Sequence, residues 1–446
     1  MTTFLKPNAA ENRVAYLARL LERVAPKQGQ EGLVKELGDR SRAIAQELAI
    51  PSTKEEEWRF TDLSPLLEID FQATAPVQLD PAALTQFKLS ETAESRLVFV
   101  NGIYAPALSS VAGLPDSVVA GNLAAVSQKF AEISDYLGKQ QGAREVFTAL
   151  NSAGLSDAAV VVIKRNAIID TPIHLLFIST IGKTAIAIQP RILVVAEPGS
   201  ACTLIEEYVV AGSEWCQGGT SPYFTNSVAE IWVGANAEVG HARIEREAAN
   251  AFHIGKSAIA QAKDSRYTCT AITTGAKISR HNLEIYQTGE GTDTTLNGLT
   301  AIAGQQLADT HSTLMLAHPH GTARQLHKCI VDDRAHSVFN GKVFVPKAAQ
   351  LTDASQLNRN LLLSRKARAD TKPQLEIVAD NVKCTHGATV SQLEADELFY
   401  LQSRGLDPIT SRNLLIDGFA GEIIQKLPLA SLGKRLSRCI ACRTDI

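Results

Sequence analysis

Two residues near the C-terminus, Cys384 and His386, have types and spacing suited to iron chemistry. Alternate residues of a β-strand point to the same face, so a C-x-H pair on a strand presents sulfur and imidazole side by side. Thiolate and imidazole both bind iron. Two ligands do not close a site, so a metal here would be shared with a second surface. The alternative is a small buried Cys384 and a hydrogen-bonded His386 in a turn at Gly387, and chemistry alone favours it.

A second group of candidate ligands lies between residues 311 and 336. The chain has 10 His and 7 Cys residues, and six of these 17 fall in this segment. Residues one coil apart stack in a solenoid, which predicts that His311 and Cys329 are neighbours. His318 is the third candidate ligand of this group. No C-x-x-C or H-x-x-x-H pattern completes a tetrahedral set here, so we favour hydrogen-bonded turn residues over a metal site.

Other motifs carry less chemistry. Cys439 and Cys442 form a lone C-x-x-C pair, which is a weak zinc or redox signal. The chain has neither a G-x-x-x-x-G-K-[ST] phosphate loop nor a G-x-S-x-G elbow. We therefore expect no ATP hydrolysis by a P-loop.

Composition narrows the class of protein. The 446 residues carry a formal net charge of −3, so no basic surplus supports binding to nucleic acid. No apolar run approaches the ~18 residues of a membrane span, and no signal peptide is evident. Seven scattered cysteines fit reduced thiols better than a disulfide framework. These features predict a cytoplasmic protein that binds no membrane.

Three regions differ in their sequence pattern. Residues 1–95 are mainly helical, with apolar stripes over 14–24 and 33–48, and a surface loop at 51–61 that Trp58 anchors. Residues 96–389 lack helical periodicity and contain short β-branched segments between small-residue turns. Residues 390–446 return to helix.

The turns of the middle region recur at short and uneven intervals, at Gly291, Gly304, Gly321, Ala335, Ala348 and Ala367. An irregular period of this size indicates one coil, or a major part of one, of a parallel β-solenoid. A β-sandwich is the alternative, because its strands also recur at short intervals. The uneven spacing and long extent favour the solenoid.

The last region contains several helix signals. Ser391 and Glu394 have capping-box spacing, Gly405 suits a C′ position, and Asp407-Pro408 suits an N-cap followed by proline at N1. A stripe through Ile416, Ala420, Ile423 and Leu427 predicts internal packing. Phe399, Tyr400 and Arg404 lie apart from that stripe, and such residues are typical of protein interfaces.

Five segments together resemble the SufD family of the SUF iron–sulfur cluster assembly machinery. They are Arg324-Gln-Leu-His-Lys328, Val338-Phe-Asn-Gly341, Asn360-Leu-Leu-Leu363, Asp370-Thr-Lys-Pro-Gln-Leu-Glu-Ile377 and Val382-Lys-Cys-Thr-His-Gly-Ala-Thr389. The N-terminal segment Lys54-Glu-Glu-Glu-Trp-Arg-Phe-Thr61 is similar to SufB and SufD chains. SufB-like chains have His-Glu-Ala where this chain has His386-Gly-Ala388, which favours SufD.

The resemblance implies a right-handed parallel β-helix flanked by an N-terminal and a C-terminal helical region. It also implies a heterodimer with SufB through the two solenoids, and docking of the SufC ATPase on the C-terminal helices, where we place Phe399, Tyr400 and Arg404. His386, with Cys384 as a weaker candidate, would lie at the SufB interface. A nascent Fe–S cluster or iron would be held there transiently, and none stably by this chain alone. The resemblance also implies that this chain is a non-catalytic subunit of an assembly complex that contains an ATPase. The isolated chain is expected to be able to form a homodimer.

Three other interpretations remain open. The chain could be a SufB-like primary cluster scaffold, or a structural β-solenoid without metal chemistry. It could also be a carbohydrate-active solenoid enzyme, which would need paired carboxylates on one face and usually a secretion signal.

Overall fold

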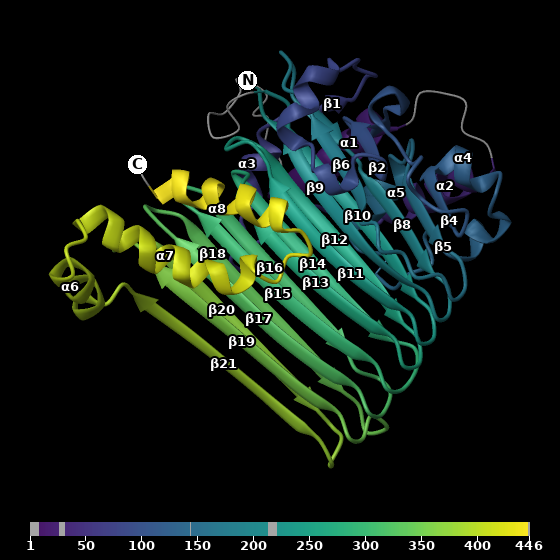
Figure 1. The fold of residues 1–446 in the computed structure, drawn as a ribbon. Coiled ribbons are helices and arrows are strands. Elements are labelled where there is room, and N and C mark those ends of the chain that lie inside the picture. Colours follow the sequence, from purple (N-terminus) through teal and green to yellow (C-terminus); the bar gives the residue numbers. More distant parts are fainter. Residues whose placement is uncertain (1–8, 26–31, 143, 213–220, 445–446) are drawn as a thin grey trace.

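The computed structural model describes residues 9–25, 32–142, 144–212 and 221–444, with the side chains of 9–11 and 439–444 left out. Two β-sheets stacked face to face dominate it (Figure 1). From β8 onward, the chain alternates between the sheets, and from β10 onward each strand pairs in parallel with the strand two earlier. The fold is therefore a parallel β-solenoid, as predicted, and neither a sandwich nor a doubly wound sheet.

The first sheet contains the strands β4 (Val118–Asn122), β5 (Ala159–Ile163), β8 (Arg191–Ala196), β10 (Tyr223–Val233), β12 (Phe252–Gln261), β14 (Ile278–Gln287), β16 (Leu307–Met315), β18 (His336–Val345) and β20 (Arg368–Ile377), with β1 (Gln72–Ala73) and β7 (Ile186–Ile188) beside them. The second sheet contains β2 (Arg96–Val100), β3 (Ile103–Tyr104), β6 (Ile173–Ser179), β9 (Ala201–Val210), β11 (Glu238–Arg246), β13 (Arg266–Thr273), β15 (Asp293–Ile302), β17 (Thr322–Val331), β19 (Asp353–Leu362) and β21 (Lys383–Gln392). Strands β20 and β21 are the last strands of the two sheets.

One full coil contains one strand from each sheet. Successive strands of the first sheet begin at Phe252, Ile278, Leu307, His336 and Arg368, and these starts lie about twice as far apart as the small-residue turns. The distance from one such turn to the next therefore measures half a coil. The predicted stacking of His311 on Cys329 is wrong for this reason: His311 pairs in register with Asn340, on the first sheet, whereas Cys329 lies on the second.

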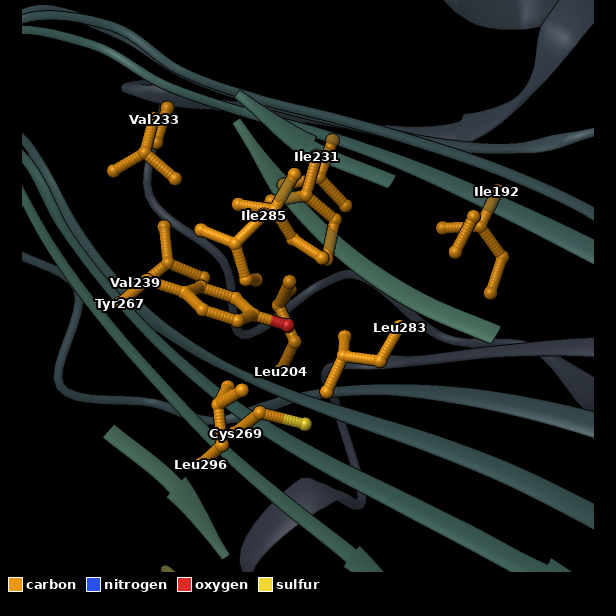
Figure 2. Close-up of a cluster of buried hydrophobic side chains, with 14 of the residues drawn as sticks. Ile192, Leu204, Ile231, Val233, Val239, Tyr267, Cys269, Leu283, Ile285 and Leu296 are labelled. Carbon is orange, nitrogen blue, oxygen red and sulfur yellow. The ribbon is translucent and has the colours of Figure 1, made fainter. Parts of the chain in front are cut away.

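Aliphatic side chains fill the space between the sheets. Figure 2 shows part of this core, in which Ile231 and Ile285 of the first sheet approach Leu204 and Val239 of the second. Equivalent residues of successive coils align, and one such row in the first sheet runs Val194, Ile231, Ile259, Ile285, Leu314 and Val343. A single coil cannot bury such a row, so burial requires stacking of the coils.

Helices of the N-terminal region cover the outer face of the first sheet. They are α1 (Ala9–Val24), α2 (Gly32–Gln46), α3 (Ser64–Leu67) and α5 (Val146–Ala153), and most of them pack on the outward-facing Phe224, Phe252 and Ile278. The short α4 (Leu123–Ser127) lies nearby (Figure 1). The expectation that residues 96–389 contain no helices is wrong, because α4 and α5 lie within them. Every residue of α5 is buried, and its 8 residues are too few for helical periodicity to be recognised from the sequence.

The C-terminal helices α7 (Pro408–Ile424) and α8 (Ala430–Thr444) lie across the outer face of the second sheet (Figure 1). Asp407 caps α7 by accepting hydrogen bonds from two backbone amides, with Pro408 in the first turn, and the stripe through Ile416 is buried, all as predicted. Gly405 follows α6 (Ala395–Ser403) with a φ of +93°, as expected of a C′ glycine. The predicted capping box is wrong, because Ser391 belongs to β21.

The Trp58 segment, residues 55–61, connects the N-terminal region to coils that come much later in the chain. Trp58 is buried beside Phe147, and Arg280 lies over its ring with 3.8 Å from the guanidinium carbon to the ring centroid. Thr61 donates a hydrogen bond of 2.5 Å to Asp309. The anchoring role predicted for Trp58 is confirmed.

Candidate functional site at the open end of the solenoid

Strand β21 is the last strand of the second sheet and has a neighbour, β19, on one side only. The Lys383 amide donates a hydrogen bond to the carbonyl of Thr352, which directly precedes β19. The Lys383 amide therefore points toward β19. Successive residues of a strand direct their amides to opposite sides, so the amides of Cys384, His386 and Ala388 face the open edge. Strand β20 is also terminal, but Pro373 removes one donor from its middle. Strand β21 is therefore the edge with the continuous row of free donors.

Cys384 and His386 lie on the interior face of β21. They pair in register with Ala354 and Gln356, whose side chains are buried between the sheets. His386 is exposed because no further coil covers it, whereas Cys384 is half-buried against the core. Gly387 lies within the strand and not in a turn, so the interpretation of His386 as a turn residue is wrong.

Partial burial raises the pKa of the Cys384 thiol. The thiolate form, which binds metal, is therefore disfavoured at this position. Of the two residues, His386 is better placed to bind a metal.

A row of buried polar side chains leads to His386 from inside the solenoid. Gln356 donates a hydrogen bond of 2.8 Å to Gln325, which in turn donates one of 2.8 Å to Ser312. The Gln356 carbonyl oxygen is buried and has no hydrogen-bond partner within the described part of the chain. The strand register pairs Gln356 with His386, so this side-chain oxygen could accept a hydrogen bond from an imidazole N–H.

Gln356 and Gln325 are candidates that sequence reasoning missed. Glutamines on strands are common, and the signal is the coil register, in which Gln325, Gln356 and His386 follow one another. The true coil length is needed to find this row.

His311 is held between two carboxylates. One ring nitrogen lies 3.1 Å from Glu57 and the other 3.0 Å from Asp309. Burial lowers the pKa of His311, but the charge of Asp309 and the hydrogen bonds to Asp309 and Glu57 together outweigh it, and the net shift of the pKa is upward. The positive charges of His311 and Arg280 outweigh the burial of Asp309, so its pKa lies below the usual value. Because both ring nitrogens have partners, His311 is part of the attachment of the Trp58 segment and not a free ligand.

The other two members of this group lie elsewhere. The His318 backbone amide donates to Gln287 in the turn before β17. Cys329 is buried among Ile302, Val331 and Ala335, and burial raises its thiol pKa to about 12. Within the described ranges, no three His, Cys, Asp or Glu side chains are arranged to hold a metal ion. Cys439 and Cys442 fall within α8, but their side chains lie outside the described ones.

Helix α6 projects beyond β21 and buries none of its residues. Phe399 is 72% exposed and Tyr400 is 57% exposed, and Arg404 lies over the Tyr400 ring at 5.3 Å from its centroid. Ile409 and Leu414 on the neighbouring α7 are exposed as well. The three predicted docking residues thus lie together at α6, apart from the packed stripe of α7. No helix in the described part of the chain is both long and apolar enough to cross a membrane.

Comparison with known proteins identifies the family. Residues 178–419 match the SufBD core domain of the SUF system for FeS cluster assembly, and residues 26–175 match the SufBD N-terminal region. An iron–sulfur cluster assembly SufBD family protein of Synechocystis is 52% identical over 89% of this chain and 88% of its own.

Two more distant relatives agree. Protein ABCI7 of Arabidopsis thaliana, named as chloroplastic, is 35% identical over 85% of this chain and 79% of its own. The iron–sulfur cluster assembly protein SufD of Escherichia coli is 30% identical over 87% of this chain and 89% of its own. The chain therefore belongs to the SufBD family of the SUF iron–sulfur cluster assembly system and is SufD-like.

Proposed function

We propose that this protein is the SufD-type accessory subunit of a SUF complex. It pairs with a SufB-type subunit, docks a SufC-type ATPase, and supports ATP-driven assembly of nascent iron–sulfur clusters and their transfer to apoproteins. The observation that carries the proposal is the position of His386, exposed on strand β21, which has a neighbouring strand on one side only. The cluster is the cargo of the complex and is not held stably by this chain.

Pairing occurs by strand addition at β21. A partner strand would accept the row of outward amides from Cys384 to Val390, and main-chain hydrogen bonds of this kind give affinity without demanding particular side chains. Val390 is an exposed apolar residue on the same strand and would be covered. In the absence of a SufB-type partner, two copies of this edge can pair around a two-fold axis.

His386 supplies an imidazole to a site shared across this interface. A neutral imidazole binds ferrous iron through one nitrogen, and the Gln356 carbonyl oxygen accepts a hydrogen bond from the other. The thiolate comes from the partner, because burial keeps the Cys384 thiol protonated.

The ATPase docks on α6. Its exposed Phe399 and Tyr400 and the neighbouring Arg404 are of the types that dominate protein interfaces. The helices α7 and α8 serve to attach this surface to the solenoid through the cluster that contains Ile416 and Leu436.

Two alternatives differ in measurable ways. A structural solenoid without metal chemistry would form the same complex, but mutation of His386 would leave its cluster content unchanged. A SufB-like primary scaffold would assemble a cluster without a SufB-type partner.

The test is co-expression with SufB-type and SufC-type partners, followed by affinity purification and sizing. Ala388→Pro removes an outward amide from β21 and should prevent co-purification of the SufB-type partner. The matched control is Ala369→Pro. It removes an outward amide from β20, whose edge Pro373 already interrupts, and should leave the complex intact. Equal recovery from both variants would place the interface elsewhere.

A further inference from the structure

A cavity of about 300 Å³ lies between the N-terminal helices and the outer face of the first sheet, far in the chain from β21. Helix α2 forms one wall, with Leu37 and Ile44, and Val228 and Ala258 of the sheet form another. The loop 138–142, between α4 and α5, lies at its mouth. The cavity is large enough for a small organic molecule.

Two cationic side chains form the floor of the cavity, and both are buried. Arg191 contacts Glu230 at 2.5 Å and donates to Asn151 and Ser152, but its Nε has no partner in the described structure. Glu230 in turn accepts hydrogen bonds from the backbone amides of Gly138 and Gln140. The floor is thus fixed to the loop at the mouth.

Lys256 is the second floor cation, and its side chain is only 5% exposed. Its ammonium nitrogen lies 2.8 Å from a Glu284 oxygen, yet this contact lacks hydrogen-bond geometry and the ammonium has no hydrogen-bond acceptor within the described residues. A Cβ on Gly142 would lie 1.9 Å from that nitrogen, and Gly142 has a φ of +78°. Glycine at 142 therefore allows the loop to approach the ammonium. Glu284 compensates the charge of Lys256, but the N–H donors of a buried ammonium are costly to leave without an acceptor.

Three further cations surround the mouth: Arg40, Lys139 and Arg144, all exposed. Three carboxylates oppose the five cations: Glu230 on the floor, Glu284 beside Lys256, and Glu47, which lies 3.9 Å from Arg144. These eight side chains together carry a formal charge of +2, although the whole chain carries −3. A positive concave surface in a negative protein attracts anions.

We propose that this cavity binds a small organic phosphate. The phosphate group would lie among Lys256 and the mouth cations, because Lys and Arg form charge-assisted hydrogen bonds with phosphate oxygens. The apolar part of the ligand would lie against Leu37, Ile44 and Val228. None of these residues belongs to β21 or α6, so the site is independent of the proposed subunit contacts.

Isothermal titration of the full chain with phenyl phosphate tests this proposal, with inorganic phosphate and phenol as separate arms. Phenyl phosphate should bind, inorganic phosphate should bind more weakly because it lacks the apolar part, and phenol should show no binding up to about 10 mM. No binding of phenyl phosphate at that concentration overturns the proposal. If inorganic phosphate binds as tightly as phenyl phosphate, the apolar part of the ligand contributes nothing, and the assignment to an organic phosphate is overturned.

Lys256→Met keeps the length of the side chain and removes its charge. It should weaken the binding of phenyl phosphate at least about tenfold. The matched control is Lys263→Met, which removes an exposed lysine paired with Glu290 outside the cavity and should leave the affinity unchanged. Because Lys256 is buried, the exposed Lys139→Gln provides a second variant that should fold normally and should weaken binding about threefold. If Lys139→Gln and Lys256→Met, measured as separate single variants, both bind phenyl phosphate with unchanged affinity, the proposal is overturned.

Discussion

Removal of Arg435 should loosen the C-terminal helices from the solenoid. Arg435 of α8 contacts both carboxylate oxygens of Glu207, at 2.7 and 2.8 Å, and Glu207 is fully buried on the outer face of the second sheet. Burial raises the pKa of Glu207, but the charges of Arg435 and Arg246 outweigh it and the pKa lies below its usual value. Glu207 is therefore ionised and needs its partners.

The free energy lost in Arg435→Met depends on the partners that Glu207 keeps. Loss of one partner from a buried ion pair costs ~3–5 kcal/mol, because the other charge stays buried. In Arg435→Met, Glu207 would keep Arg246 at 2.6 Å and His174 at 3.1 Å, and the lost side chain was 18% exposed. We therefore expect about 2–3 kcal/mol, which corresponds to a roughly 30- to 150-fold rise in local opening.

Hydrogen–deuterium exchange of peptides from α8 measures this opening directly. The control is Lys434→Met on the same helix, an exposed lysine whose loss should change exchange less than about threefold. If Arg435→Met also changes exchange less than threefold, the apolar contacts of Leu432 and Leu436 hold the helix unaided and our estimate of the ion pair is wrong.

Three further outcomes are expected. Phe399→Ser with Tyr400→Ser should reduce SufC-type binding at least tenfold by surface plasmon resonance and leave the melting temperature unchanged, because both side chains are exposed; retained binding would exclude α6. The pKa of His311 is raised, so its stabilisation of the Trp58 segment is complete below pH 6.5 and lost as pH rises through the folded value. Limited proteolysis of the segment should therefore accelerate above pH 6.5 in the wild type, and a similar acceleration in His311→Gln would contradict this. Gln356→Leu should lower cluster content without disrupting the complex, whereas full content would show that Gln356 does not orient His386.

Local signals in the sequence predicted much of the architecture. The cap at Asp407, the glycine at 405 and the stripe through Ile416 depend on neighbouring residues and were predictable. The alternation of short strands and turns similarly indicated a solenoid. Helix α5 was not predictable from its pattern, because its 8 residues are too short a window for helical periodicity.

The surroundings of the site depended on register. The distance between turns does not reveal that two turns make one coil, so His311 and Cys329 were wrongly expected to stack. The same uncertainty concealed the row that joins Gln356 to His386. The contact between Glu57 and His311, 254 positions apart, has no local signal in either segment.

The most direct test of the central claim is the iron and sulfide content of the complex. The complex with SufB-type and SufC-type partners would be purified anaerobically from cells that express the wild type, His386→Ala or Cys384→Ser. His386 is exposed, so His386→Ala should preserve the fold and the complex and should lower iron and sulfide at least fivefold. Cys384→Ser should have the smaller effect, because that thiol packs against the core. Normal cluster content in an intact His386→Ala complex would contradict the account and leave this protein a structural partner.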